Sequence, residues 1–467
     1  MLNDFFVLMK HELLVTLIIF ILLFVKVGSK EWSNEAVSKL VNFLLLVNLL
    51  VGFFMNKEGS LFSEIFHNNP LIVLEKNILN LGTLIISLQA YNWLTKHQHV
   101  VEFYILLLST LLGMFFMISS GNLLLFYLGL ELSTIPLAAL ANFDLDKRTS
   151  SEAAMKFIIS SAFSSGLLLM GISFMYGTTG TISFTEIPQQ LDGSTLQLFS
   201  FILLLAGFAF KISVVPFHLW TADVYEGSPV PVTSYLSVIS KGAIVFVFAS
   251  TLFTVFEPLA SAWYGMLFFL SILTMLIGNL FAIRQDNLKR FLAFSSIAQV
   301  GFILVGISGG GQAATASVVY FILVYIFSNL GAFGVIALVS ANTGKESIGD
   351  YRGFYKTNPM LAWVLTISLF SLAGIPPTAG FFGKFFLIMA GASKGNYWLI
   401  VIAALNMIIS LYYYLRVVRA MFMDNNETPI EKLSISAMPK FALFICMAGI
   451  IITGLLSWVY EYIFSLS

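Results

Sequence analysis

The chain has 467 residues, of which 58% are hydrophobic and only 10% are charged, and its formal net charge is zero. Soluble domains carry about 25% charged residues and disordered chains have low hydrophobicity, so both classes are excluded. The neutral balance provides no basic surface for nucleic acid. The one cysteine, Cys446, excludes a disulfide framework and a thiolate-rich metal or iron–sulfur site. The remaining class is an all-α polytopic membrane protein.

Continuous apolar runs of about 20 residues predict about fourteen transmembrane helices. Their approximate centres are Ile19, Leu46, Ile85, Leu111, Leu130, Ala162, Phe208, Ser240, Leu273, Val300, Ile326, Phe370, Ile409 and Ile450. The first run is short and contains Lys26. No small-residue cleavage site follows it, so we interpret it as a retained span rather than a signal peptide.

The positive charges of the predicted loops indicate how the chain is oriented. Most of them fall on the side opposite the N-terminus, including Lys30, Lys147, Arg284, Lys345 and Arg352. On the N-terminal side, the predicted loops contain only Lys10, Lys57, Lys76 and Lys394. Cytoplasmic loops carry the excess of Lys and Arg. We therefore expect both termini on the outer side of a membrane, with the bacterial inner membrane as its setting.

Several charged residues fall inside the predicted spans, where each costs about 2.5–3.5 kcal/mol on insertion scales. Glu131, Lys211 and Lys241 lie about ten to fourteen residues into their spans, which is near the midplane at 1.5 Å per residue. Lys384 is also deep, whereas Lys156 is only about five residues from the start of its span. One interpretation is structural pairing between helices. Snorkelling does not explain the midplane residues, because a lysine stem reaches only about a turn and a half.

The functional interpretation is a proton path. Burial disfavours the charged form of lysine and a nearby carboxylate favours it, so moving one partner can switch proton binding. We expect Glu131 to form such a pair with Lys211, across the fifth and seventh spans. Arginine could not serve, because its pKa stays above about 12. A Na⁺ site would instead need carboxylate and carbonyl oxygens.

Prolines interrupt two of the spans that contain these lysines. The seventh span reads FAFKISVVPFHLW, with Lys211 and Pro216, and the twelfth reads LFSLAGIPPTAGFFGKFF, with Pro376, Pro377 and Lys384. Proline frees backbone carbonyls, which membranes tolerate only where they line a polar cavity or are buried in protein. Each break is therefore predicted to mark a hydrated site. His218, at the end of the seventh span, is a weaker candidate for proton uptake.

The two breaks are five spans apart, and a shift by an odd number of spans inverts the orientation. This spacing predicts two inverted five-helix repeats with discontinuous helices seven and twelve. The expected division is an N-terminal three-helix segment (1–98), a first repeat (99–255), a second repeat (256–422) and a last span (423–467). No dinucleotide, Walker A or haem-binding motif is present, so we expect no cofactor on this chain and an energy source in a partner protein.

Long motifs resemble a known family. The runs GLELSTIPLAAL, FKISVVPFHLWTADVYEGSPVPVTSYLSVISKGA, NLKRFLAFSSIAQVGFIL and SLAGIPPTAGFFGKF are similar to those of the antiporter-like subunits of respiratory complex I, from about residue 100 to 420. The resemblance implies a proton channel built from both repeats. It also implies partners, namely other membrane subunits of the complex within the lipid bilayer, and FMN, iron–sulfur clusters and quinone on partner subunits.

The resemblance also implies a role for individual residues. Glu131, Lys211, Lys241 and Lys384 match the family's relay positions, and Lys156, His218 and Pro376 fall on its motifs. Phe294, Gln299 and Phe302 depart from the family pattern in the tenth span, which argues against a titrating group there. Two alternatives stay open: a subunit of a multi-subunit Na⁺/H⁺ antiporter, and a stand-alone solute transporter.

Overall fold

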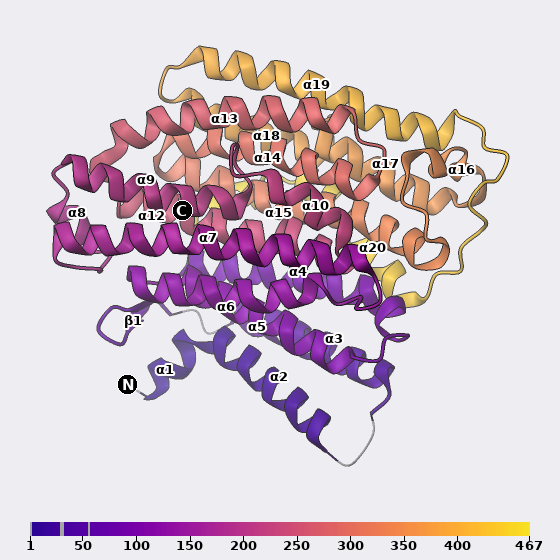
Figure 1. Ribbon diagram of the computed structural model, residues 1–467, viewed down its shortest axis with the longest axis horizontal. Coiled ribbons are helices and arrows are strands. Elements are labelled where there is room, and N and C mark those ends of the chain that lie inside the picture. The colour runs from indigo at the N-terminus through magenta and orange to yellow at the C-terminus, as the bar shows by residue number, and fades with distance from the viewer. Residues whose placement is uncertain (1, 29–31, 55–56) are drawn as a thin grey trace. The chain divides into compact units, whose positions relative to one another are not determined.

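The computed structural model describes residues 2–28, 32–54 and 57–467, and Lys30 lies outside these ranges. The described chain is helical apart from loops and one short hairpin, as predicted for an all-α protein (Figure 1). It forms two compact units: residues 1–84, 94–212 and 239–263 make unit 1, and residues 85–93, 213–238 and 264–467 make unit 2. The repeat boundaries expected from the sequence differ from this division and stay a prediction.

Unit 1 contains the N-terminal helices and most of the predicted first repeat. Its elements are α1 (Leu2–Leu8), α2 (Lys10–Val27), α3 (Asn34–Phe53), β1 (Gly59–Leu61), β2 (Phe66–Asn68), most of α4 (Pro70–Leu94), α5 (Val100–Ile118), α6 (Leu123–Ala141), α7 (Arg148–Thr179), α8 (Ile187–Gln190), α9 (Thr195–Ile212), α12 (Lys241–Thr254) and the 3₁₀ turn η2 (Glu257–Leu259). The antiparallel hairpin of β1 and β2 was not expected from the sequence.

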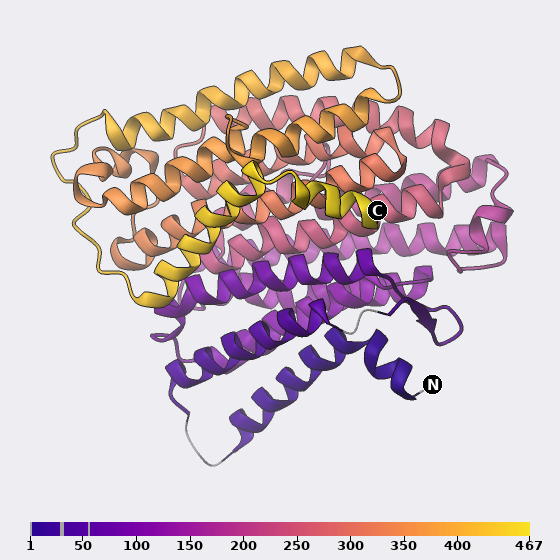
Figure 2. The same ribbon diagram turned by 180° about the vertical axis from the view of Figure 1, so that it is seen from behind.

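Unit 2 contains the later helices. Its elements are α10 (Leu219–Gly227), α11 (Val230–Tyr235), most of α13 (Ala260–Ile283), α14 (Leu288–Gly309), α15 (Gly311–Thr343), the 3₁₀ turn η3 (Ile348–Tyr351), α16 (Phe354–Thr357), α17 (Pro359–Ala373), α18 (Ala379–Ala392), α19 (Tyr397–Phe422), α20 (Ala437–Leu455) and α21 (Trp458–Leu466). A π-helical turn, η1 (Leu236–Ser240), connects α11 to α12. The yellow helices α20 and α21 pack along α15 (Figure 2).

Close helix packing in unit 1 depends on glycines at the α5–α6 interface. A Cβ on Gly113 would lie 2.7 Å from the carbonyl oxygen of Gly129, and one on Gly129 would lie 2.8 Å from that of Gly113. Small residues let helix backbones approach in this way in membrane proteins. The contact holds α6 directly against α5, with α7 packed beside α6 and α9 beside α7 (Figure 1).

The helices agree with a polytopic membrane protein. By length and composition, twelve helices of the described chain could cross a membrane. The shorter apolar helices α17 and α18 are the two parts of the predicted twelfth span, and α2 occupies the first. All the predicted span centres lie in helices. The expected total of about fourteen is consistent with this arrangement but stays a prediction.

The loop assignment of two lysines was wrong. Lys10 is the first residue of α2 and Lys76 is the seventh residue of α4, and both side chains are buried. Each lies near the end of an apolar run, where a lysine is expected to belong to the adjoining loop. Their removal from the loop count leaves still fewer positive charges on the N-terminal side, so the expected orientation of the chain is unchanged.

Candidate functional site: buried lysines at two helix breaks

Lys211 lies at the C-terminal end of α9 and is 8% exposed. Its Nζ donates hydrogen bonds to Thr134 Oγ1 on α6 at 2.9 Å and to Ser161 Oγ on α7 at 2.6 Å. A cation is favourable at a helix C-terminus because of the helix dipole. The ammonium is therefore held by hydroxyl groups from two other helices of unit 1.

A direct ion pair between Glu131 and Lys211 was expected, and the structure corrects this. Lys211 contacts the hydroxyls of Thr134 and Ser161 instead, while Glu131 Oε1 is buried without a hydrogen-bond partner among the described residues. Glu131 lies one turn before Thr134 on α6, so it shares a face with this hydroxyl. It remains within Coulombic range of Lys211. The carboxylate therefore acts on the lysine through space rather than by direct contact.

The first helix break follows Lys211 and lies between α9 and α10, where Pro216 was predicted to cause it. Ser213 has a positive φ of 68°, a strained conformation for a non-glycine residue. Within unit 2, Thr221 donates to Ser213 Oγ at 2.7 Å, and the Val215 backbone N–H donates to Thr274 Oγ1 at 3.1 Å. The break is therefore supported by polar side chains, which is what irregular backbone inside a membrane requires.

The two weaker candidates have different surroundings. His218 is buried at the N-terminus of α10, and its Nδ1 has no hydrogen-bond partner in the described chain. Lys156 is exposed and forms an ion pair with Glu152, one turn earlier on α7, at 2.7 Å. His218 therefore lies inside the protein with an open ring nitrogen, whereas Lys156 lies on the surface of this chain.

Lys241 is the first residue of α12 and is 3% exposed. It directly follows the π turn η1, and π turns within α-helices are frequent at functional sites. α12 packs against α5 and α9 in unit 1. The predicted burial of this lysine is confirmed.

The second break lies between α17 and α18 and contains Pro376 and Pro377, as predicted. Lys384 on α18 is 1% exposed and reaches back to the end of α17. Its Nζ donates to the Leu372 carbonyl at 2.8 Å and to the Ala373 carbonyl at 3.3 Å. The interrupted helix itself supplies no N–H partner for carbonyls at its end. Lys384 thus satisfies the end of the half-helix.

Hydroxyl groups also stabilise this second break. Ser371 Oγ accepts the backbone N–H of Gly380 at 3.1 Å and the hydroxyl of Ser328 at 2.7 Å. Each break contains one X–Pro bond in the cis form, Val215–Pro216 in the first and Pro376–Pro377 in the second. At both breaks a hydroxyl also accepts a hydrogen bond from a backbone N–H group: Thr274 does so in the first and Ser371 in the second.

Two of the departures in the tenth span, Gln299 and Phe302, lie next to Lys384 or its carbonyl partners. The ring of Phe302 lies 4.8 Å from Lys384 Nζ, in cation–π contact. Gln299 Nε2 donates to the same Leu372 carbonyl at 3.0 Å and to the Tyr414 hydroxyl at 3.2 Å. Phe294 stacks on Phe281. Gln299 therefore takes part in the hydrogen-bond network, which fits the expectation that it does not titrate.

The hydrogen-bond partners of the lysines could not be predicted from the sequence. Thr134 and Ser161 are far from Lys211 in the chain, and serine and threonine are common in transmembrane helices, so only their packing distinguishes them. The partner of Asp223 and Glu226 was not predicted either: both pair with Arg290 on α14, at 2.7 and 2.8 Å.

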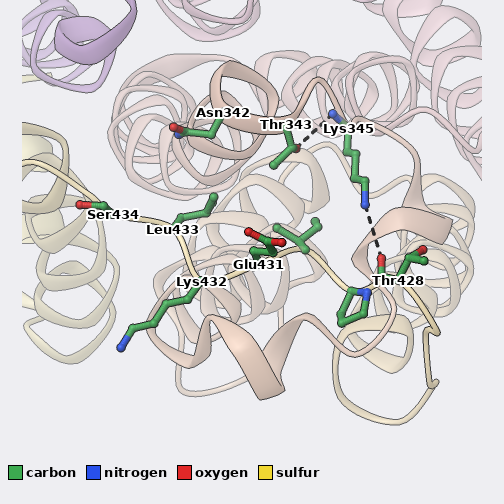
Figure 3. A pocket seen from close by; sticks show the side chains of 10 residues that line it. Asn342, Thr343, Lys345, Thr428, Glu431, Lys432, Leu433 and Ser434 are labelled. Atoms are coloured by element: carbon green, nitrogen blue, oxygen red, sulfur yellow. Dashed lines mark hydrogen bonds between the residues drawn. The ribbon is translucent and has the colours of Figure 1, made fainter.

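The surface also has a cavity of about 770 Å³ in unit 2, between the end of α15 and the segment before α20 (Figure 3). Lys345 Nζ donates to the Thr428 carbonyl at 3.4 Å across it. None of the predicted relay residues lines this cavity. It is a loop cavity rather than a part of the lysine sites.

The arrangement suits proton transfer. A hydroxyl can accept a hydrogen bond from an ammonium group and donate another, so it can pass a proton on, whereas a carbonyl can only accept. Lys211 is bound by hydroxyls and Lys384 by carbonyls, each in an apolar helical environment. Lysine is the basic residue that can release its proton when such surroundings change.

This combination of interrupted membrane helices and buried lysines defines a proton-handling, antiporter-like membrane protein. The family described as NADH:quinone oxidoreductase/Mrp antiporter, TM matches residues 120–410. This match covers more than half of the chain, so the chain belongs to this family.

The relatives are more specific than the family. A protein of Phocaeicola vulgatus named NADH-quinone oxidoreductase subunit N is 49% identical over 94% of this chain and 93% of its own length. A protein of the same name from Azobacteroides pseudotrichonymphae is 44% identical over 99% of this chain and 98% of its own.

Solved structures share the fold. A chain of respiratory complex I from Thermus thermophilus is 27% identical, with a TM-score of 0.82 over 97% of this chain and 98% of that chain. A chain of the Mrp complex from Dietzia sp. DQ12-45-1b gives a TM-score of 0.85 over 98% of this chain and 96% of that chain, at 20% identity, which shows the fold alone.

Proposed function

We propose that this chain is a proton-translocating membrane subunit of NADH:quinone oxidoreductase, in the position of subunit N. Two relatives with that name, matched over nearly their whole lengths, support the proposal. In this proposal the chain itself carries no redox group. FMN, iron–sulfur clusters and quinone belong to partner subunits, and quinone reduction there supplies the energy. The other membrane neighbours include antiporter-like paralogues.

The observation that carries the mechanism is the binding of the Lys211 ammonium by two hydroxyls in a buried site. Proton release from Lys211 breaks an N–H bond and forms an O–H bond on the accepting hydroxyl, which at the same time gives its own proton to the next acceptor and so stays neutral. Thr134 and Ser161 are the groups nearest the ammonium on this route. The Thr134 hydroxyl also donates to the Leu130 carbonyl at 2.7 Å, so that hydrogen bond must break before Thr134 can pass a proton on. Glu131, within Coulombic range, stabilises the charged lysine. A change in the position or charge of Glu131 therefore alters whether Lys211 keeps its proton.

We infer that Lys211, Lys241 and Lys384 act in series. All three are buried, and two of them lie at helix breaks. At Lys384 the proton-loaded state is held by the Leu372 and Ala373 carbonyls, which accept hydrogen bonds but have no proton to pass on. In this proposal His218 and Lys156 have lesser roles. His218 takes part in proton uptake, and Lys156 lies at the edge of the path, on the surface of the chain.

The relay is tested by replacing each lysine with arginine and with alanine in the assembled complex. Arginine keeps the positive charge but does not release a proton. We expect Lys211→Arg and Lys384→Arg to abolish proton uptake coupled to quinone reduction as completely as alanine does. Subunit content is checked by gel, because alanine also deletes a buried cation. Full pumping by both arginine variants would leave a structural ion network in place of the relay.

The second candidate is a subunit of a Na⁺/H⁺ antiporter, whose fold this chain shares. The two functions differ in what purifies with the chain. A complex with NADH:quinone oxidoreductase activity brings flavin and iron–sulfur absorbance, whereas an antiporter is colourless. Purification through a tag on this chain, followed by an absorption spectrum, therefore decides between them. We place the chain in a bacterial inner membrane with both termini outside.

A further inference from the structure

The N-terminal helices enclose a second group of charges, separate from the lysines described above. Glu12 of α2 and Lys76 of α4 form an ion pair of 2.6 Å, and their side chains are 2% and 0% exposed. Lys10 donates to the Phe54 carbonyl at 2.7 Å, and Glu75 is also buried. Two cations and two carboxylates are thus buried within 1–98, a segment outside both predicted repeats.

A chain of polar side chains extends from this group. His11, next to Glu12, contacts Asn48 Oδ1 of α3 through Nδ1 at 3.1 Å. Asn48 Nδ2 donates to Asn80 Oδ1 at 3.2 Å, and Asn80 Nδ2 donates to the Leu45 carbonyl at 3.0 Å. Because this network makes Asn48 Oδ1 an acceptor, His11 must donate through Nδ1. Nε2 of the neutral ring is then an acceptor.

Three buried polar residues of α4 lie on one face of the helix. Lys76, Asn80 and Thr83 recur at intervals of four and three residues, and each is 0% exposed. They continue along a helix long and apolar enough to cross a membrane. A single ion pair that only joined two helices would not require the polar stripe to continue beyond it.

Two buried polar atoms here have hydrogen-bonding capacity that the described residues do not use. They are Nε2 of His11, which contacts Asn48, and Oδ1 of Asn77, which follows Lys76 in α4 and lies against Gly52 of α3. An unsatisfied polar group in an apolar interior costs roughly 2–7 kcal/mol. These atoms therefore favour binding of water or of a hydrated proton between α2, α3 and α4.

We propose that Glu12, His11 and Lys76 form a proton-binding site within the N-terminal three-helix segment. A hydronium ion transfers its proton to the Glu12 carboxylate, where an O–H bond forms, and the water that remains can donate a hydrogen bond to His11 Nε2. The site gains one positive charge, and protonation of Glu12 replaces its ion pair with Lys76 by a neutral carboxyl group. Release is the reverse step. This site lies beyond the proposed lysine relay and does not depend on it.

The surroundings confine the proton to this site. Lys10 lies beside it on α2, and Glu75 precedes Lys76 on α4. The ring of Phe66 on β2 lies 5.0 Å from Lys76 Nζ, and the ring of Phe115 on α5 lies 5.7 Å from that of His11. Aromatic rings thus cover the site from β2 and α5, and the amides of α3 line it.

The test is a pH-induced infrared difference spectrum of the purified whole complex, which requires no catalytic turnover. We expect a carboxyl band that titrates in the wild type and is lost in the double variant Glu12→Gln/Lys76→Met. Removing both charges of a buried pair is often neutral for stability, so this variant should assemble. Glu12→Asp keeps the charge, and we expect it to shift the band.

The matched control is the double variant Asp4→Asn/Lys57→Met, which removes an exposed ion pair of the same segment. It should leave the band in place. Loss of the band in the control, a spectrum of Glu12→Gln/Lys76→Met identical to the wild type, or an unshifted band in Glu12→Asp would each overturn the proposal. The spectrum is recorded at equilibrium and needs no proton pumping. It therefore tests proton binding at Glu12 independently of the lysine relay, even if the arginine variants disprove that relay.

Discussion

The two hydroxyls that bind Lys211 provide a sharp test of the proposed proton route. Thr134→Val preserves the shape of the side chain and removes the hydroxyl, and Ser161→Ala removes the other hydroxyl. Each change deletes one hydrogen bond to the ammonium, of 2.9 or 2.6 Å. If the proton leaves through these groups, either variant should slow its transfer while the complex still assembles.

The expected size of the effect follows from the bond that is lost. A hydrogen bond to a charged group contributes about 1.5–3 kcal/mol. If the transition state for transfer uses the same hydroxyl and loses this energy, each variant should transfer protons about 10- to 160-fold more slowly, since 1.36 kcal/mol corresponds to a tenfold change in rate. Thr134→Ser and Ser161→Thr keep the hydroxyl and should retain most of the activity.

The assay is proton uptake per NADH oxidised in vesicles that contain the complex, with assembly checked by gel. Ser160→Ala is the matched control, because the Ser160 hydroxyl bonds to carbonyls of its own helix. Wild-type rate and stoichiometry in both Thr134→Val and Ser161→Ala would refute the reasoning, since the proton would then not pass through either hydroxyl.

Three further predictions concern the carboxylate, the second break and the topology. Glu131→Gln should assemble but stall proton transfer, and normal pumping stoichiometry would make the carboxylate dispensable. Gly380→Ala should destabilise the break by about 1–3 kcal/mol through overpacking, because its Cβ would lie 1.7 Å from the Ser371 carbonyl oxygen. Gly166→Ala, with nothing within 4 Å of the added Cβ, should be tolerated, and subunit abundance and thermal unfolding measure both. A reporter fused after Ser467 should be active on the outer side, and activity only in the cytoplasm would contradict this orientation.

The sequence predicted the features that depend only on the order of residues along the chain. Pro216, Pro376 and Pro377 interrupt apolar runs, and a lysine within such a run is conspicuous because its burial is costly. The helix breaks and the burial of Lys211 and Lys384 follow directly from these patterns, and the structure confirms them.

The partners of these residues depend on tertiary packing and could not be predicted. Attraction between opposite charges suggested that Glu131 would contact Lys211, but the packing of α6 and α7 presents hydroxyls there instead. Lys76 escaped notice because a lysine near the end of an apolar run usually reaches water. Its burial depends on tertiary packing, because α2 places Glu12 against Lys76 of α4.

The π turn before Lys241 has a consequence for sequence register. A π turn holds one residue more than an α-helical turn, so α11 and α12 follow helical phases that differ by about 100°. A protein that lost one residue between Leu236 and Ser240 could form a continuous α-helix there, and Lys241 would then point in a different direction without any change of amino acid. A one-residue gap at this place in an alignment would therefore mark a reoriented lysine, and residue identity alone would not reveal it.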